Sequence, residues 1–122
     1  MPHLTFQYST NVTNYLDTSA VLASLHNCLG ACPFVKMEHI KSKKQGFDTV
    51  LIANHIEKAS FLHCEVALFV GRPATVLNRL QQDLLRILRE SAFRCPLPCW
   101  ISVELREIPT SGLVAEIVHP EQ

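Results

Sequence analysis

Hydrophobic and polar residues alternate along residues 3–9, 37–44 and 100–108, and this period of two is typical of half-buried β-strands. Residues 61–70 are apolar on both faces, which predicts a strand at the centre of a sheet rather than at its edge. We expect Gly46 to break the second strand, because glycine weakens the interior of a strand. The pattern therefore predicts four principal strands.

Two further stretches carry apolar residues at helical spacing. The first follows a run of capping residues at positions 17–19, and Gly30 is placed to close that helix in a left-handed conformation. The second begins at Pro73, a residue suited to the first turn of a helix, and continues to about residue 92. Each helix lies between two of the predicted strands.

Weaker patterns occupy the rest of the chain. A short apolar run at residues 49–53 predicts a ribbon at the sheet edge, and residues 54–60 are typical of a polar connection. Two prolines within residues 95–99 predict a rigid connector into the strand at 100–108. Residues 113–118 predict a weak last strand.

The order of elements is strand–helix–strand followed by strand–helix–strand over residues 1–122, without an intervening linker. Each half can form a right-handed βαβ unit. We therefore expect one domain of the α+β class, in which a four-stranded mixed sheet carries both helices on one face. The other face and at least one edge of that sheet need covering, so we expect a symmetric ring of identical subunits.

The charge balance argues against two classes of partner. Eleven basic and eleven acidic residues give a net charge of zero, so neither a nucleic acid nor a membrane surface is expected. No apolar run approaches the ~18 residues of a membrane span, and the start lacks a signal-peptide pattern, so we expect a cytoplasmic protein. Five cysteines, an odd number, fit reduced thiols in that compartment.

The second residue carries the candidate chemistry. If Met1 is removed, Pro2 becomes the amino terminus, and its secondary amine is a base held on a rigid ring. Such an amine has a pKa of about 7.7–8.0, which neighbouring cations or an apolar wall lower toward working pH. Lys41 on the second strand and Arg72 after the third can converge with it on a small acidic molecule. The start of the following helix also attracts anions.

Four motifs carry a resemblance to a known family. They are the opening MPHLTFQYSTN, IKSK at residues 40–43, FDT at residues 47–49, and FLH followed by GR between residues 61 and 72. Together they resemble 5-carboxymethyl-2-hydroxymuconate isomerase, of the tautomerase superfamily that includes 4-oxalocrotonate tautomerase and macrophage migration inhibitory factor. The motifs fall in register without gaps from residue 2 to residue 72, whereas the region after residue 92 is similar only in pattern.

The resemblance implies a role for each candidate residue. Pro2 matches the family's catalytic proline and Arg72 its substrate-binding arginine, whereas Lys41 stands where the family has a second arginine. Lys43 falls on a further basic position of the same strand face. The implied reaction is a 1,3-proton shift in a small unsaturated keto acid, without a metal or organic cofactor, and the implied assembly is a homotrimer.

Two alternatives remain open at this stage. The same site residues suit a tautomerase for another keto acid, such as a phenylpyruvate. If Met1 is retained, it acylates Pro2 and removes the base, which leaves a non-enzymatic trimeric protein of the same fold. Intact mass distinguishes the second alternative, and a panel of keto–enol substrates distinguishes the first.

Cysteines and histidines raise the separate question of a metal site. Two Cys-x-x-x-Cys pairs, at residues 28 and 32 and at residues 95 and 99, are wider than the usual zinc-binding spacing, so we expect buried, inert thiols. His3 and His63 fall on strands that are expected to be neighbours, where a packed histidine is commoner than a metal ligand.

Overall fold

The computed structural model describes residues 1–55 and 58–120; residues 56 and 57, inside the predicted polar connection, and residues 121 and 122 lie outside that part. The strands are β1 (His3–Ser9), β2 (Lys41–Phe47), β3 (Ser60–Phe69) and β4 (Cys99–Ile108). The α-helices are α1 (Thr18–Gly30) and α2 (Ala74–Ala92). Short 3-10 turns lie at Thr10–Asn14, Met37–His39 and Thr110–Gly112.

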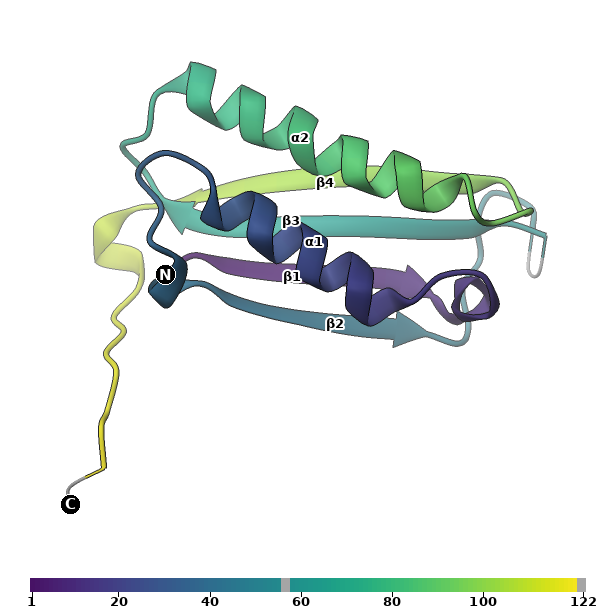
Figure 1. The fold of residues 1–122 in the computed structure, drawn as a ribbon, viewed down its shortest axis with the longest axis horizontal. Helices are drawn as coiled ribbons and strands as arrows, with labels where there is room; N and C mark the ends of the chain where they lie inside the picture. The colour runs from purple at the N-terminus through teal and green to yellow at the C-terminus, as the bar shows by residue number, and fades with distance from the viewer. Residues whose placement is uncertain (56–57, 121–122) are drawn as a thin grey trace.

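The four strands form one mixed sheet in the order β2-β1-β3-β4. Within each half the two strands are parallel and a helix connects them, whereas β1 and β3 meet antiparallel at the centre. Both helices cover the same face of the sheet (Figure 1). The predicted α+β arrangement of two βαβ units is therefore confirmed.

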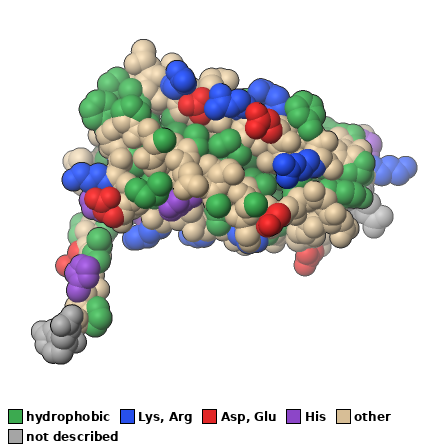
Figure 2. Space-filling view, in the orientation of Figure 1, with side chains coloured by type: hydrophobic (Ala, Val, Ile, Leu, Met, Phe, Trp, Pro, Cys, Tyr) green, Lys and Arg blue, Asp and Glu red, His purple; other side chains and the backbone are tan. Residues whose placement is uncertain are grey.

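Alternation along the strands decides which side chains pack beneath the helices. Leu4 and Phe6 of β1 and Leu62 of β3 are fully buried there, against Leu25 of α1 and Leu84 of α2. Burial of each such side chain stabilises the fold by about 1.5–3 kcal/mol. Charged side chains gather instead along the outer surface of α2 (Figure 2). No helix among residues 1–55 and 58–120 is long and apolar enough to cross a membrane.

The opposite side of the sheet, which we call the open face, has no helix over it in the described chain. β3 lies between β1 and β4, as predicted, but it is fully buried only on the side that faces the helices. On the open face it carries His63 and Glu65, which are partly exposed. Lys41 and Lys43 of β2 lie on the same face, because their register partners on β1 are His3 and Thr5.

The second strand differs from its prediction at both ends. The pattern predicted residues 37–44, but residues 37–39 form a 3-10 turn and β2 runs from Lys41 to Phe47. Gly46 therefore lies inside the strand and does not break it. A Cβ atom at Gly46 would lie 2.9 Å from the ring of Tyr8 on β1, so glycine allows the two strands to pair past that ring.

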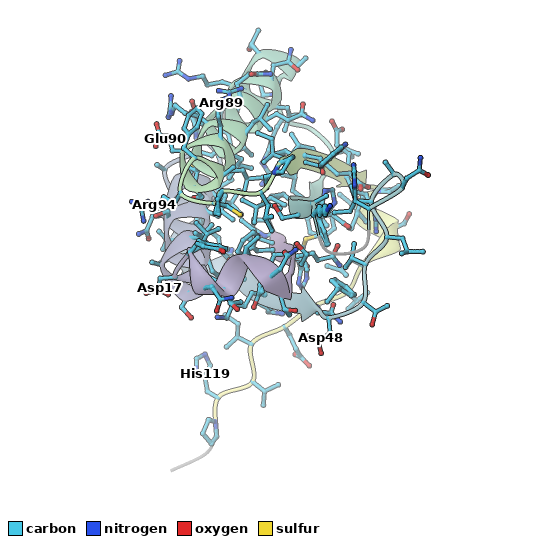
Figure 3. All side chains as sticks on the ribbon, turned by 90° about the vertical axis from the view of Figure 1, so that its right-hand side faces the viewer. Asp17, Asp48, Arg89, Glu90, Arg94 and His119 are labelled. Atoms are coloured by element: carbon cyan, nitrogen blue, oxygen red, sulfur yellow. The ribbon has the colours of Figure 1, made fainter. Side chains whose placement is uncertain are left out.

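The first helix begins as predicted and ends differently. The Asp17 carboxylate accepts hydrogen bonds from the backbone N–H groups of Ser19 and Ala20, both at 3.1 Å, and caps α1 (Figure 3). The expected left-handed cap at Gly30 is wrong, because the helix closes at Ala31 with a φ of −85°. A Cβ atom at Gly30 would meet the flexible end of the Met37 side chain, which would have to move.

Two weak strand predictions are also wrong. Residues 113–118 form no strand, and Val114 is 98% exposed on a segment that leaves the body of the molecule together with His119 (Figures 1 and 3). The ribbon expected at residues 49–53 is reduced to one bridge between Ile52 and His55. A strand requires a neighbour for its backbone hydrogen bonds, and neither segment has a strand beside it in the described chain.

Candidate active site

The amino terminus lies at the end of the sheet where β1 and β2 begin and β3 ends. Pro2 is fully buried, and its carbonyl accepts a hydrogen bond from the backbone N–H of Lys41 at 3.1 Å. The next residue, His3, pairs with Lys41 on one side and with Ala67 on the other. Backbone pairing therefore fixes the position of Pro2 and brings Lys41 beside it.

Arg72 follows β3 and reaches the same end of the sheet. Its Nη1 donates to the carbonyl of Phe69 at 2.8 Å, and its Nη2 donates to the carbonyl of Phe34 at 3.1 Å. Its Nε is buried and, among residues 1–55 and 58–120, has no hydrogen-bond partner. The guanidinium is thus held in place by carbonyl groups rather than neutralised by a carboxylate.

The lysines of β2 extend this positive region along the open face. Lys41 and Lys43 are both exposed. In the described chain neither of them, nor Arg72, lies within ion-pairing distance of a carboxylate. Three cations without an internal counter-ion are available to an external anion, such as a carboxylate.

The charges act on the amino terminus and on His3. In the chain that carries Met1, burial lowers the pKa of the terminal amino group, and the charges of Lys41 and Arg72 lower it further. Burial likewise lowers the pKa of His3, with contributions from Lys41, the amino terminus and Lys43. An amine in this position is therefore biased toward its neutral, basic form. The four predicted residues, Pro2, Lys41, Lys43 and Arg72, lie around one end of the sheet.

A protein-family model matches most of the chain. The model describes 5-carboxymethyl-2-hydroxymuconate isomerase, and it matches residues 2–115. The chain belongs to the 5-carboxymethyl-2-hydroxymuconate isomerase family. The resemblance noted in the sequence is confirmed, and the protein is an isomerase of that family. No curated protein matches the sequence.

Solved structures agree with this isomerase in fold. A 5-carboxymethyl-2-hydroxymuconate isomerase from Deinococcus radiodurans R1 is 20% identical, with a TM-score of 0.84, over 94% of this chain and 88% of that chain. A 5-carboxymethyl-2-hydroxymuconate delta-isomerase is 15% identical, with a TM-score of 0.77, over 98% and 89%. A fused 4-OT symmetric trimer is 16% identical, with a TM-score of 0.73, over 93% and 90%. At these identities the likeness establishes the fold.

Sequence reasoning missed the part that Phe34 plays in this isomerase. Phe34 has a φ of 70°, which is uncommon for a bulky residue, and its carbonyl accepts the hydrogen bond from Arg72. Its side chain is 71% exposed. No local signal in the sequence reports a contact between residues that are 38 positions apart.

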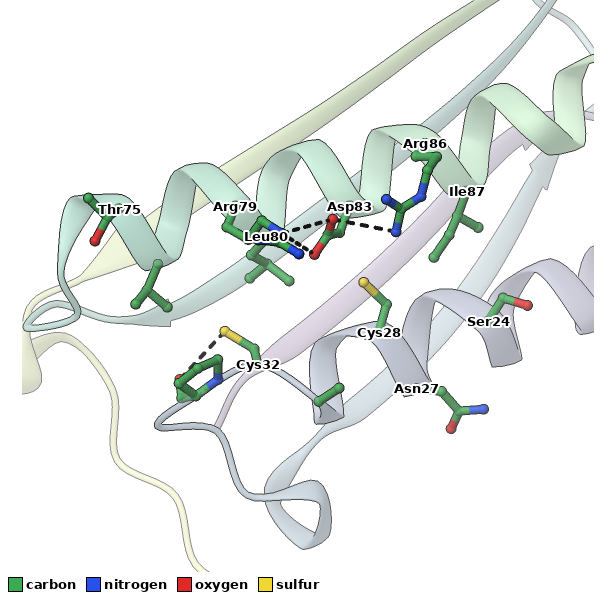
Figure 4. Close-up of a pocket in the computed structure, with 13 residues that line it drawn as sticks. Ser24, Asn27, Cys28, Cys32, Thr75, Arg79, Leu80, Asp83, Arg86 and Ile87 are labelled. Atoms are coloured by element: carbon green, nitrogen blue, oxygen red, sulfur yellow. Dashed lines mark hydrogen bonds and ion pairs between the residues drawn. The ribbon is translucent and has the colours of Figure 1, made fainter.

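A hollow in the isomerase lies elsewhere, between the two helices. A cavity of about 800 Å³ is lined by Cys28 and Cys32 from the α1 side and by α2, where Asp83 pairs with Arg79 and Arg86 (Figure 4). A second hollow, of about 330 Å³, lies beside Phe47. Neither includes Pro2, Lys41 or Arg72.

The cysteines of the isomerase are all free thiols. Burial raises the pKa of Cys64 to about 12, and it also raises the pKa of Cys28, Cys32 and Cys99. Thiols with raised pKa values are poor nucleophiles and poor metal ligands near neutral pH. This supports the interpretation of the cysteines as packing residues.

Proposed function

We propose that this protein is a 5-carboxymethyl-2-hydroxymuconate delta-isomerase whose general base is the amine of Pro2, exposed by removal of Met1. The observation that carries the proposal is the backbone pairing that holds Pro2 beside Lys41, at the end of the sheet that Arg72 also reaches. In the chain that carries Met1, burial and then the charges of Lys41 and Arg72 lower the pKa of the terminal amine at this place. A neutral secondary amine on a rigid ring is a base that is already oriented before the substrate binds. The family to which the chain belongs supports an isomerase that moves a proton.

The proposed reaction is a 1,3-proton shift. The neutral Pro2 amine removes a proton from the unsaturated keto acid, and the bonding electrons move into a conjugated dienolate. The protonated amine then returns that proton to a carbon further along the conjugated system, which restores the neutral base. The proton count balances within one turnover, and no oxidant or reductant is consumed.

In this proposal, the cations hold the substrate and its developing charge. Arg72 binds a carboxylate of the substrate, while Lys41 and Lys43 stabilise the enolate oxygen and remaining negative charge. The carbonyl groups of Phe69 and Phe34 support this role, because they fix the guanidinium before the substrate arrives. Each of these two bonds uses one N–H of Nη1 or Nη2, so the second N–H of each nitrogen remains for the substrate.

Substitution of Lys41 tests how the site binds its substrate. Lysine presents a point charge where an arginine would present two parallel donors, so Lys41→Arg is expected to keep or improve kcat/KM for the muconate substrate. Lys41→Ala should raise KM about tenfold with a smaller change in kcat, since it removes one charge-assisted contact. Steady-state kinetics of both variants measure these effects.

The matched control for Lys41 lies on the same strand. Lys44 faces the helices and donates to the hydroxyls of Thr18 and Ser19, both at 2.8 Å. Lys44→Ala should therefore leave KM unchanged. If Lys41→Ala gave the same kinetics as Lys44→Ala and the wild-type protein, Lys41 would be a surface lysine without a role in the site.

We also propose that the protein is a homotrimer. The open face of the sheet and the β2 edge have no covering element in the described chain, and relatives of this fold include fused 4-OT trimers. Light scattering of the untagged protein at micromolar concentration should therefore give three times the chain mass of 13.7 kDa. A monomer under these conditions would contradict the proposal.

The two alternatives require separate measurements. Intact mass of the native protein should show the loss of Met1, whereas a retained Met1 would favour the non-enzymatic protein of the same fold. A panel that contains the muconate substrate and a phenylpyruvate should show faster turnover of the muconate. Faster turnover of phenylpyruvate would be consistent with the Pro2 mechanism and would change the assigned substrate.

A further inference from the structure

His63 lies on the open face of the sheet with one ring nitrogen fixed and the other unused. Its Nδ1 shares a hydrogen bond of 2.7 Å with Oγ of Ser102, its register partner on β4. With Nδ1 as the donor, Nε2 carries the lone pair that can bind a metal ion. In the described chain Nε2 has no hydrogen bond, and the nearest carboxylate oxygen, Oε1 of Glu104, is 3.8 Å away.

Two carboxylates meet beside this imidazole. Glu65 and Glu104 are direct register partners on β3 and β4, so like charges lie opposite one another, which destabilises a strand pair. Arg106 bridges them, at 2.9 Å from Glu65 and 3.4 Å from Glu104, but its side chain is 56% exposed. A nearby cation reduces the repulsion between the two carboxylates. Arg106 brings one positive charge against two negative ones, and an ion pair in solvent stabilises only weakly.

We propose that His63, Glu65 and Glu104 form a binding site for a divalent transition-metal ion, with Zn²⁺ as the probe that fits the ligand set. One potential ligand atom from each residue lies within 4.8 Å of the others. A tetrahedral zinc ion with bonds of about 2.0–2.2 Å separates its ligands by roughly 3.3 Å, so side-chain torsions of the two glutamates can close the triad.

The hydrogen bond to Ser102 is what distinguishes this triad from an exposed acidic cluster. A metal-binding histidine usually has its other nitrogen hydrogen-bonded, which fixes the tautomer and the direction of the ring. Here that bond is present before any metal binds, and the side chain of His63 is only 21% exposed. Arg106 competes with the metal for both carboxylates, so its removal should strengthen binding rather than weaken it.

The metal site is independent of the proposed proton chemistry. His3 pairs with Ala67, and His63 lies four residues before Ala67 on β3, a separation of roughly 13 Å along the strand. The two histidines that the sequence placed on neighbouring strands are therefore not a pair. The metal would instead be bound by residues of both β3 and β4. Coordination of the two carboxylates to the ion would replace the repulsion between them.

The test is a calorimetric titration of the untagged, chelator-treated protein with Zn²⁺. We expect one ion per chain and a zinc-dependent rise in Tm, because a ligand bound only by the folded state stabilises it. His63→Ala should weaken binding by more than about 100-fold, and Ser102→Ala by about 10- to 100-fold, the range typical of a lost outer partner. Arg106→Gln should tighten binding several-fold.

Two controls separate this triad from other zinc ligands. His55→Ala removes an exposed histidine from a different segment and should leave the affinity for Zn²⁺ unchanged. The Co²⁺-loaded protein should lack thiolate-to-metal charge-transfer absorption, because no cysteine belongs to the triad. Binding that persists in His63→Ala, weakens in Arg106→Gln, or shows thiolate absorption would overturn the proposal.

Discussion

A protein that carries a residue or tag ahead of Pro2 is expected to lose isomerase activity by about 100- to 10,000-fold, the usual contribution of a positioned general base. An acylated proline nitrogen is an amide and cannot accept the proton. Pro2→Ala, once Met1 is removed, keeps a primary amine and should retain partial activity. The measurement is kcat/KM of each preparation, with its amino terminus assigned by intact mass.

The pH dependence of the same reaction gives an independent readout. The working base is the neutral amine, so kcat/KM should rise as pH increases through the pKa of that amine and then reach a plateau. In the chain that carries Met1, burial lowers the pKa of the terminal amine most, and the charges of Lys41 and Arg72 lower it further. The same charges lie beside Pro2, so Lys41→Ala should move the rising limb toward higher pH. Full activity in a protein with a blocked amino terminus would overturn the assignment of Pro2.

Arg72→Ala is expected to reduce kcat/KM by roughly 10- to 150-fold, which corresponds to about 1.5–3 kcal/mol for a lost charged hydrogen bond. The variant also leaves the carbonyl of Phe34 without its donor, so the segment around residue 34 loses an attachment. Arg72→Lys keeps the charge but cannot reach both carbonyl groups in the same geometry, and it should recover only part of the loss. Steady-state kinetics measure both effects.

Arg79→Ala provides the matched control for Arg72. Arg79 is an exposed arginine of α2 that pairs with Asp83 at 3.3 Å, away from the amino terminus. Its loss should leave kcat/KM within twofold of the wild-type value, because exposed ion pairs of this kind contribute little. Equal activities for Arg72→Ala and Arg79→Ala would remove Arg72 from the proposed mechanism.

Most of the fold follows from local patterns, and the errors have physical causes. The β1 strand and α2 follow alternation and helical spacing over many residues, and Asp17 caps α1 as its side chain predicts. The errors at Gly30 and Gly46 share one reason. The sequence predicts that each glycine ends its element, whereas in the structure each lies close to a side chain from another segment.

The sequence also predicts which residues of the candidate site lie together, but not the contacts that hold them. The strand order places Pro2, Lys41 and Arg72 at one end of the sheet, which the two βαβ units already implied. The carbonyl of Phe34 that holds Arg72 was not predictable, because the contact depends on how a turn packs against the end of β3. The hydrogen bond between His63 and Ser102 was not predictable either, since it depends on the register between β3 and β4.

The sequence by itself determined the four principal strands, the two helices, their order and the family, because periodicity, capping residues and short motifs are properties of neighbouring positions. Only the tertiary structure decided where β2 begins, since pairing with β1 sets its register. It also decided that Glu65 and Glu104 lie opposite one another beside His63. Such contacts are made between residues that are far apart in the chain. They arise from strand register and packing, which no local pattern specifies.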